Sequence, residues 1–129
     1  MKAPEKKIVL VVEDDATTAS ALLSQLESAG LGVLVARDGR AGLALALEKH
    51  PDLILLDLQM PKMDGRTMFM ELSRDQWGMS VPVIILTTTA NPDIIVQTVR
   101  DGVSDYLVKA DHSIHDVVKK VKERLGHIF

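Results

Sequence analysis

Short unbroken apolar runs alternate along the chain with longer segments in which apolar residues recur every three or four positions. The short runs indicate strands buried on both faces, and the recurring pattern indicates amphipathic helices. Ile8–Val12 is the first predicted strand. A helical pattern follows from Ala16, and Gly30 is expected to end that helix as a left-handed cap.

The same alternation repeats four more times before the end of the chain. The further predicted strands are Gly32–Ala36, Leu53–Leu56, Val83–Leu86 opened by Pro82, and Ser104–Val108. The further predicted helices are Arg40–Lys49, Arg66–Asp75, a helix capped by Asn91 that runs to about Asp101, and His112 to about Gly126. Five β-α units predict an α/β fold, a doubly wound parallel sheet with helices on its two faces.

Polar residues stand where the predicted strands end. Glu13 and Asp14 follow the first strand, Asp57 follows the third, Thr87 follows the fourth and Lys109 follows the fifth. The carboxyl ends of parallel strands share one edge of the sheet, so these residues are expected to converge in one crevice. Asp15 is a further acid after the first strand. The sequence leaves its role open, either as a member of the cluster or as the cap of the first helix.

The residue types in this crevice indicate phosphoryl chemistry. Carboxylates that crowd together repel one another and need a cation or protons. Their oxygens suit Mg²⁺, which takes one or two protein carboxylates. A lysine and a threonine hydroxyl can hold phosphoryl oxygens while Asp57 accepts the group, as carboxylates do in covalent catalysis.

Composition and charge narrow the class of protein further. The chain has 129 residues, no cysteine and a net charge of -3. That length suits one domain, and the mild acidity argues against direct nucleic-acid binding. No apolar run approaches the ~20 residues that span a bilayer, and no signal-like stretch precedes Glu13. We expect a cytoplasmic protein with no membrane partner.

Four segments carry a resemblance to a known family. They are IVLVVEDD at 8–15, PDLILLDLQMPKMDG at 51–65, VPVIILT at 81–87 and GVSDYLVK at 102–109. With them the chain resembles the response-regulator receiver domain of two-component signalling, as found in chemotaxis regulators. The resemblance implies a flavodoxin-like strand order 2-1-3-4-5 and a single receiver domain over residues 1–129, with no output domain.

The resemblance also implies roles for the crevice residues. Asp57 would be the phosphoacceptor, forming 4-aspartylphosphate. Glu13 and Asp14 would organise Mg²⁺ (or Mn²⁺) together with Asp57, and the backbone carbonyl of Gln59 would be a further metal ligand. Thr87 would contact a phosphoryl oxygen.

Lys109 would pair with another phosphoryl oxygen. Tyr106 stands at the family's switch position, where an aromatic ring rotates inward as the threonine moves; taken alone, it could equally be a packing residue of an edge strand. The donor would be a histidine kinase or a histidine phosphotransfer protein. The target, or a second copy, would bind the face formed by the fourth helix, fifth strand and fifth helix. In this reading the protein is a signalling domain and not an enzyme.

Four positions are expected to modulate the site. Ala110 replaces the family's usual proline after the lysine, so we expect a trans Lys109–Ala110 bond and a less fixed lysine, in a loop that is either remodelled or more mobile. Thr88 replaces a smaller residue and is expected to crowd the entrance. Gln59 and Thr89 lie two residues beyond Asp57 and Thr87, where the family tunes hydrolysis of the acyl phosphate.

Three other functions deserve comparison. An aspartyl phosphatase needs a second aspartate where Gln59 stands, and a flavin-mononucleotide carrier needs a glycine- and hydroxyl-rich loop where this chain is acidic. A degenerate receiver that acts as a constitutive binding module remains open because of Ala110. We interpret His50, His112, His115 and His127 as surface residues that do not group with the acids.

Overall fold

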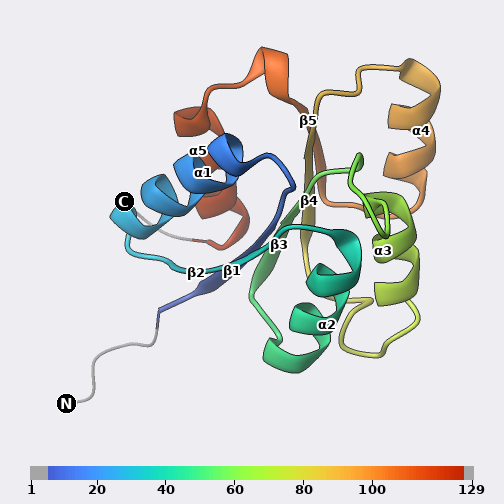
Figure 1. Ribbon diagram of the computed structural model, residues 1–129, viewed down its shortest axis with the longest axis horizontal. Helices are drawn as coiled ribbons and strands as arrows, with labels where there is room; N and C mark the ends of the chain where they lie inside the picture. Colours follow the sequence, from blue (N-terminus) through green and yellow to red (C-terminus); the bar gives the residue numbers. More distant parts are fainter. Residues whose placement is uncertain (1–5, 127–129) are drawn as a thin grey trace.

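A computed structural model of the protein describes residues 6–126. Five parallel strands form one sheet in the order β2-β1-β3-β4-β5, which confirms the predicted fold (Figure 1). The elements are β1 (Ile8–Val12), α1 (Ala16–Ser28), β2 (Gly32–Ala36), α2 (Gly39–Lys49), β3 (Leu53–Leu56), α3 (Gly65–Leu72), β4 (Val83–Thr87), α4 (Pro92–Arg100), β5 (Asp105–Val108), the 3-10 turn η1 (Lys109–Asp111) and α5 (Ile114–Arg124).

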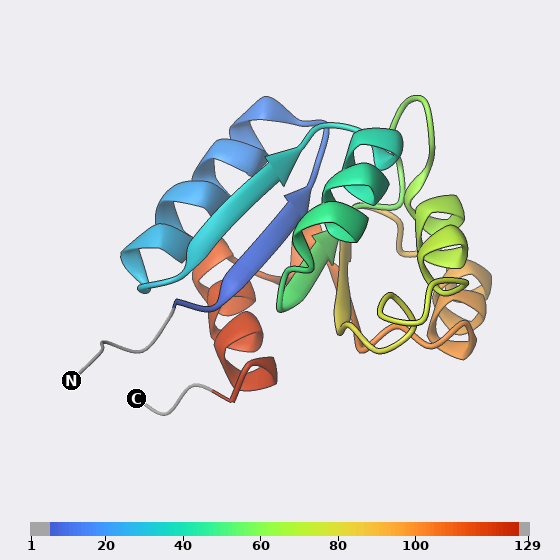
Figure 2. The same ribbon diagram turned by 90° about the horizontal axis from the view of Figure 1, so that it is seen from below.

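Two apolar cores lie on the two faces of the sheet, because successive strand residues point to opposite sides. In β1, Val9 and Val11 pack with α1 and α5, whereas Leu10 and Val12 pack with α2 and α3. Figure 1 shows α1 and α5 together on one side and α2, α3 and α4 on the other. Figure 2 shows β1 and β2 running side by side between these helices. Burial on both faces explains why β1 and β3 read as unbroken apolar runs.

The third helix ends at Leu72, three residues before the predicted end at Asp75. The Ser73 hydroxyl donates to the Phe69 carbonyl at 2.8 Å, and the Asp75 amide bonds only three residues back, to Leu72. The Asp75 carboxylate then accepts from the Gly78 amide at 2.8 Å. Polar side chains that bond to nearby backbone groups therefore end the helix early.

The last helix begins at Ile114, two residues after the predicted start at His112. Ser113 accepts from the Asp116 amide through its side chain, while the Asp116 carboxylate accepts from the Ser113 amide. This reciprocal capping box fixes the start of the helix. The preceding residues form the separate 3-10 turn that follows Lys109.

The helices begin at the edge of the sheet where the strands end. Asp15, Asp38, Asp64 and Asn91 each cap one of them through a side-chain oxygen. Gly65, the first residue of α3, lies so close to β3 that an added Cβ would stand 2.1 Å from the Asp57 carbonyl oxygen. Glycine is thus required beside Asp57. Along residues 6–126, no helix combines the length and the apolarity that crossing a membrane demands.

Gly42 tests the packing of α2 on the sheet. A Cβ at this position would lie 2.8 Å and 2.9 Å from the two methyl carbons of Val12, a stiff side chain in the buried core. We expect Gly42→Ala to lower the free energy of unfolding by about 1–3 kcal/mol, although alanine favours a helix by about 1 kcal/mol. Urea unfolding measures the change. Ser24→Ala, on the exposed face of α1, is the control and should not destabilise; a stabilised Gly42→Ala protein would contradict this packing.

Candidate functional site

The acidic residues after β1 and β3 meet at the carboxyl edge of the sheet. Val12 pairs with Leu56, so the residues that follow them, Glu13 and Asp57, leave neighbouring strands together. One carboxylate oxygen from each of Glu13, Asp14 and Asp57 lies within 4.8 Å of the others. Glu13 and Asp57 are buried, whereas Asp14 is exposed. The sequence-predicted acid cluster is therefore present in the fold.

Lys109 supplies the positive charge of this cluster from the end of β5. Its Nζ lies 2.6 Å from Glu13 Oε1 and 3.4 Å from Asp57 Oδ2. Burial raises the pKa of Glu13, and this outweighs the lowering effect of the hydrogen bond from Lys109. Burial alone would lower the pKa of Lys109, but the bond to Glu13 and the charge of Asp57 raise it. The ammonium is thus held in its charged form between two carboxylates.

The donor set fits a hard divalent cation. Ligand oxygens on opposite sides of Mg²⁺ lie about 4.2 Å apart, given its bonds of about 2.1 Å. The three carboxylate oxygens all lie within 4.8 Å of one another, a spacing compatible with ligands of one such ion. The Gln59 amide donates to Asp57 Oδ1 at 3.2 Å and orients the carboxylate on this side.

Thr87 carries a hydroxyl with an unmet hydrogen-bonding capacity. The residue is fully buried at the end of β4, and its Oγ1 finds no hydrogen-bond partner within the described residues. A buried hydroxyl left in this state costs about 1–3 kcal/mol. Such a group is suited to receive an oxygen atom that enters the crevice.

Tyr106 and Thr88 connect the loops around the site. The Tyr106 hydroxyl donates to the Thr89 carbonyl at 2.8 Å, which ties β5 to the loop after β4. Burial and the charge of Asp57 raise the pKa of this phenol. The Thr88 hydroxyl donates to the Gln59 side-chain oxygen at 2.9 Å. Of the four positions predicted to modulate the site, Thr88 and Gln59 are therefore in direct contact.

Ala110 lies in the 3-10 turn after Lys109. Every peptide bond in the described part of the chain is trans, the Lys109–Ala110 bond included. The bond is therefore trans, as expected from the absence of proline. The turn nevertheless leaves Lys109 in contact with both buried acids.

The sequence reasoning missed one residue beside the acids. Arg37 follows β2. Its Nε donates to the backbone carbonyl of Glu13 at 3.0 Å, and its Nη2 donates to the backbone carbonyl of Asp14. A basic residue just beyond a strand at the same edge was the available signal. The alternative left open for Asp15 is also resolved, because its carboxylate accepts from the Thr18 amide and hydroxyl as a helix cap.

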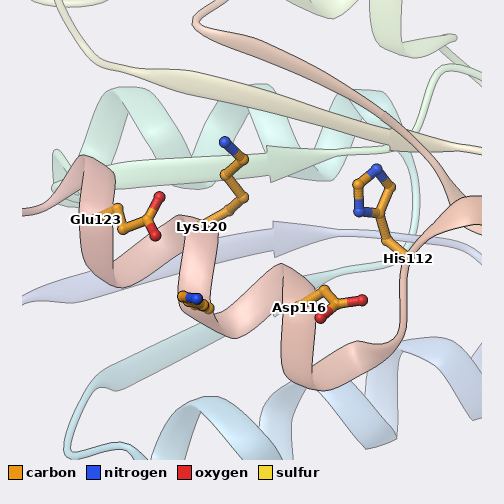
Figure 3. Close-up of a pocket in the computed structure, with 5 residues that line it drawn as sticks. His112, Asp116, Lys120 and Glu123 are labelled. Atoms are coloured by element: carbon orange, nitrogen blue, oxygen red, sulfur yellow. The ribbon is translucent and has the colours of Figure 1, made fainter.

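The histidines within the described residues stand apart from the acid cluster. His50 stacks on Trp77 with ring centroids 4.1 Å apart, before the start of β3. His112 lines a shallow pocket along α5 with Asp116, Lys119, Lys120 and Glu123 (Figure 3). Asp116 is already engaged in the capping box there. His115 is exposed, and His127 lies outside the described residues.

The sheet order, with an acid-lysine crevice at its carboxyl edge, defines a flavodoxin-like α/β domain. A family model described as response regulator receiver domain matches residues 9–122. The chain therefore belongs to the response regulator receiver domain family of two-component systems.

Relatives of this chain include regulators of different sizes. It is 36% identical over 117 residues to the DNA-binding dual master transcriptional regulator RpaA of Synechocystis, covering 91% of this chain but 48% of RpaA. It is 38% identical over 101 residues to protein PilH of Pseudomonas aeruginosa, covering 78% of this chain and 84% of PilH. The chain thus spans about half the length of the first of these relatives.

A solved structure with the same fold contains a metal ion. It is the receiver domain of a sensor histidine kinase from Pseudomonas aeruginosa, with a magnesium ion coordinated in its active site cleft. The TM-score is 0.85 at 26% sequence identity, and the match covers 95% of this chain and 99% of that one.

The charge balance of the crevice can be measured with a double-mutant cycle. We expect Lys109→Met to lower the free energy of unfolding by roughly 1–3 kcal/mol, because it leaves buried carboxylates without their cation. The loss should shrink in a Glu13→Gln background. Thermal and urea unfolding of the four proteins give the coupling energy.

The control is Lys62→Met, which removes an exposed ammonium 3.8 Å from Asp38. It should change stability by less than about 1 kcal/mol. A coupling energy near zero between Lys109 and Glu13 would show that their contact contributes nothing to the fold.

Proposed function

We propose that this receiver domain accepts a phosphoryl group on Asp57 and thereby switches a protein-binding surface. The observation that supports this most directly is the position of the Asp57 carboxylate. It lies 3.4 Å from the Lys109 ammonium and beside the acid pair that follows β1. A nucleophilic oxygen, a fixed cation and hard metal ligands are the groups that phosphoryl transfer requires.

The residues would act in a balanced transfer from phosphohistidine. An Asp57 oxygen forms a bond to phosphorus while the phosphorus–nitrogen bond breaks, and the electron pair stays on the imidazole of the donor. Lys109, whose Nζ lies 3.4 Å from Asp57 Oδ2, would pair with one phosphoryl oxygen. The buried Thr87 hydroxyl, which has no partner among the described residues, would pair with another. Hydrolysis by water would return phosphate and the free carboxylate, so the domain is a phosphoacceptor and not an enzyme acting on other molecules.

A divalent cation would be held by Asp14, Asp57 and the backbone carbonyl of Gln59, with Glu13 contributing directly or through water. Mg²⁺ or Mn²⁺ would offset the negative charge on the phosphoryl oxygens. The chain's own part is to keep these oxygens oriented. Two backbone amides orient them. The Gln59 amide donates to Asp57 Oδ1 at 3.2 Å, and the Asp15 amide donates to Glu13 Oε2 at 3.1 Å.

The surface that responds would be α4, β5 and α5, which lie beside Tyr106. The added phosphate charge would draw Thr87 and Lys109 towards it and shift an existing two-state equilibrium. The loop after β4 would move with Thr87 and release or recapture Tyr106, whose hydroxyl holds Thr89. Ile94, Val96 and Val99 of α4 are exposed and offer apolar contacts to a target or to a second copy.

Loss of Asp57 tests the proposal. We expect Asp57→Asn to abolish incorporation of phosphate from a phosphorylated histidine kinase or from acetyl phosphate with Mg²⁺, because an amide cannot accept the group. Phosphate-affinity gels and intact mass measure the incorporation. Asp111→Asn, which makes the same charge change in the turn after Lys109, is the control and should be phosphorylated normally.

Beryllofluoride with Mg²⁺ provides an independent readout through amide chemical shifts. Shifts should appear at residues 57, 87, 106 and 109 of the native protein and not of Asp57→Asn. Trp77 is a weak reporter because it stacks on His50 at the opposite edge of the sheet. A native protein that neither incorporates phosphate nor responds to beryllofluoride would instead be a degenerate receiver.

The contact between Thr88 and Gln59 predicts an effect on the lifetime of the acyl phosphate. Thr88→Ala removes both the bulk and the hydroxyl that holds Gln59 over the crevice. We expect hydrolysis to become about two- to ten-fold faster, the range that one hydrogen bond supports. Loss of ³²P-phosphate from the purified phosphoprotein measures the rate.

Thr88→Val separates the two causes, since valine keeps the bulk and lacks the hydroxyl. If the hydrogen bond restrains Gln59, valine should behave like alanine. If crowding alone protects the phosphate, valine should behave like the native threonine. Decay that is unchanged in both variants would remove Thr88 as a determinant.

A further inference from the structure

Arg37 holds the backbone of the acidic loop that follows β1. Its Nε donates to the Glu13 carbonyl at 3.0 Å, and its second nitrogen donates to the Asp14 carbonyl. A guanidinium presents its donors in a rigid fork, so it can hold two neighbouring carbonyls in fixed directions. These carbonyls belong to Glu13 and Asp14, which supply two of the three carboxylates in the acid cluster.

The hydrogen bond from Arg37 to the backbone affects the Glu13 carboxylate through the peptide unit between Asp14 and Asp15. In a trans peptide the carbonyl and the following amide point in opposite directions. The Asp14 carbonyl points to Arg37, and the Asp15 amide on the other side of that unit donates to Glu13 Oε2 at 3.1 Å. By holding the carbonyl, Arg37 aims the amide that fixes the Glu13 carboxylate.

The base of the Arg37 side chain is itself held on both sides. The preceding Ala36 accepts from the Glu13 amide at 3.0 Å, which links β2 to the acidic loop. The following Asp38 caps α2 through the Ala41 amide at 2.8 Å. Gly39 donates to the Met63 carbonyl at 3.1 Å in the loop after β3. The loop from Arg37 to Gly39 therefore contacts both loops that carry the acids.

We propose that Arg37 is a positioning residue for divalent cation binding, acting through the backbone of Glu13 and Asp14. This inference rests on the proposed function, since it concerns the same site. The predicted effect of Arg37 on Mg²⁺ affinity is opposite in sign to the effect of charge repulsion alone. A cation near the site should weaken Mg²⁺ binding through its field, whereas a positioning residue should strengthen it.

The experiment is a Mg²⁺ titration of the native protein and of Arg37→Ala, followed by amide chemical shifts of residues 13–15 and 57–59. We expect Arg37→Ala to raise the dissociation constant roughly ten-fold, the lower end of the losses seen when groups that orient metal ligands are removed. Amide exchange of Asp15 in the metal-free protein should also become faster. That second readout depends on the peptide orientation and not on bound metal.

Two further variants separate the causes. Arg40→Ala removes the same charge from the exposed start of α2 and should leave the affinity unchanged. Arg37→Lys keeps the charge without the fork and should bind Mg²⁺ almost as weakly as Arg37→Ala. It also decides the matter if the alanine variant fails to fold. Full affinity in Arg37→Lys, or equal or tighter binding in Arg37→Ala, overturns the positioning role.

The outcome for Asp57→Asn keeps this inference separable from the proposed function. One outcome is that the native protein binds Mg²⁺, with Asp57→Asn binding it weakly and Arg37→Ala binding it with full affinity. In that case the proposed site stands and the positioning role of Arg37 is wrong. If the native protein shows no saturable response at residues 13–15 and 57–59, the metal site itself is wrong and both proposals fall.

Discussion

The placement of one ammonium between two buried carboxylates is the constraint on which the rest of this structure depends. Glu13 and Asp57 leave adjacent strands at a sheet edge where water is largely excluded, and like charges there cannot both remain ionised without a counter-charge. Lys109 comes from the far strand β5 and closes the set at 2.6 Å and 3.4 Å. The sheet order matters because it lets a residue of β5 reach acids that follow β1 and β3.

This balance also constrains how a cation and a phosphoryl group could enter. Lys109 has charge enough for one of its two partners, so the cluster of Glu13, Asp14 and Asp57 keeps a negative excess. A cation would relieve that excess, and a phosphoryl group on Asp57 would restore part of it. The same lysine is therefore suited to the free and the phosphorylated states, provided that its loop lets it move. That loop begins with a trans Lys109–Ala110 bond in a 3-10 turn.

Most of the fold and the principal site residues could be predicted from the sequence, because both follow from burial. The bounds of β1, β2 and β3 agree with the prediction. β1 and β3 are buried along nearly their whole length and are therefore continuously apolar, whereas the edge strand β2 is mostly half-buried. The helix ends were harder, because the bonds of Asp75 and the capping box of Ser113 depend on local geometry. Arg37 was missed for a related reason: a basic residue just beyond β2 was visible in the sequence, but its partners are backbone carbonyls, which residue identities do not reveal. For Thr88 the sequence predicted only that its bulk crowds the entrance to the site. It did not predict the hydrogen bond that the Thr88 hydroxyl donates to the Gln59 side chain.

Thr87 shows how the resting arrangement could bias the proposed switch. Its hydroxyl is fully buried and finds no partner among the described residues, so the structure carries a penalty of about 1–3 kcal/mol at that atom. An entering phosphoryl oxygen would remove the penalty and draw the end of β4 towards Asp57. The adjoining loop carries Thr89, whose carbonyl accepts from Tyr106 at 2.8 Å. The free energy gained at the Thr87 hydroxyl would be of the same order as one or two hydrogen bonds. It could therefore offset the loss of the Tyr106 hydrogen bond when the end of β4 moves.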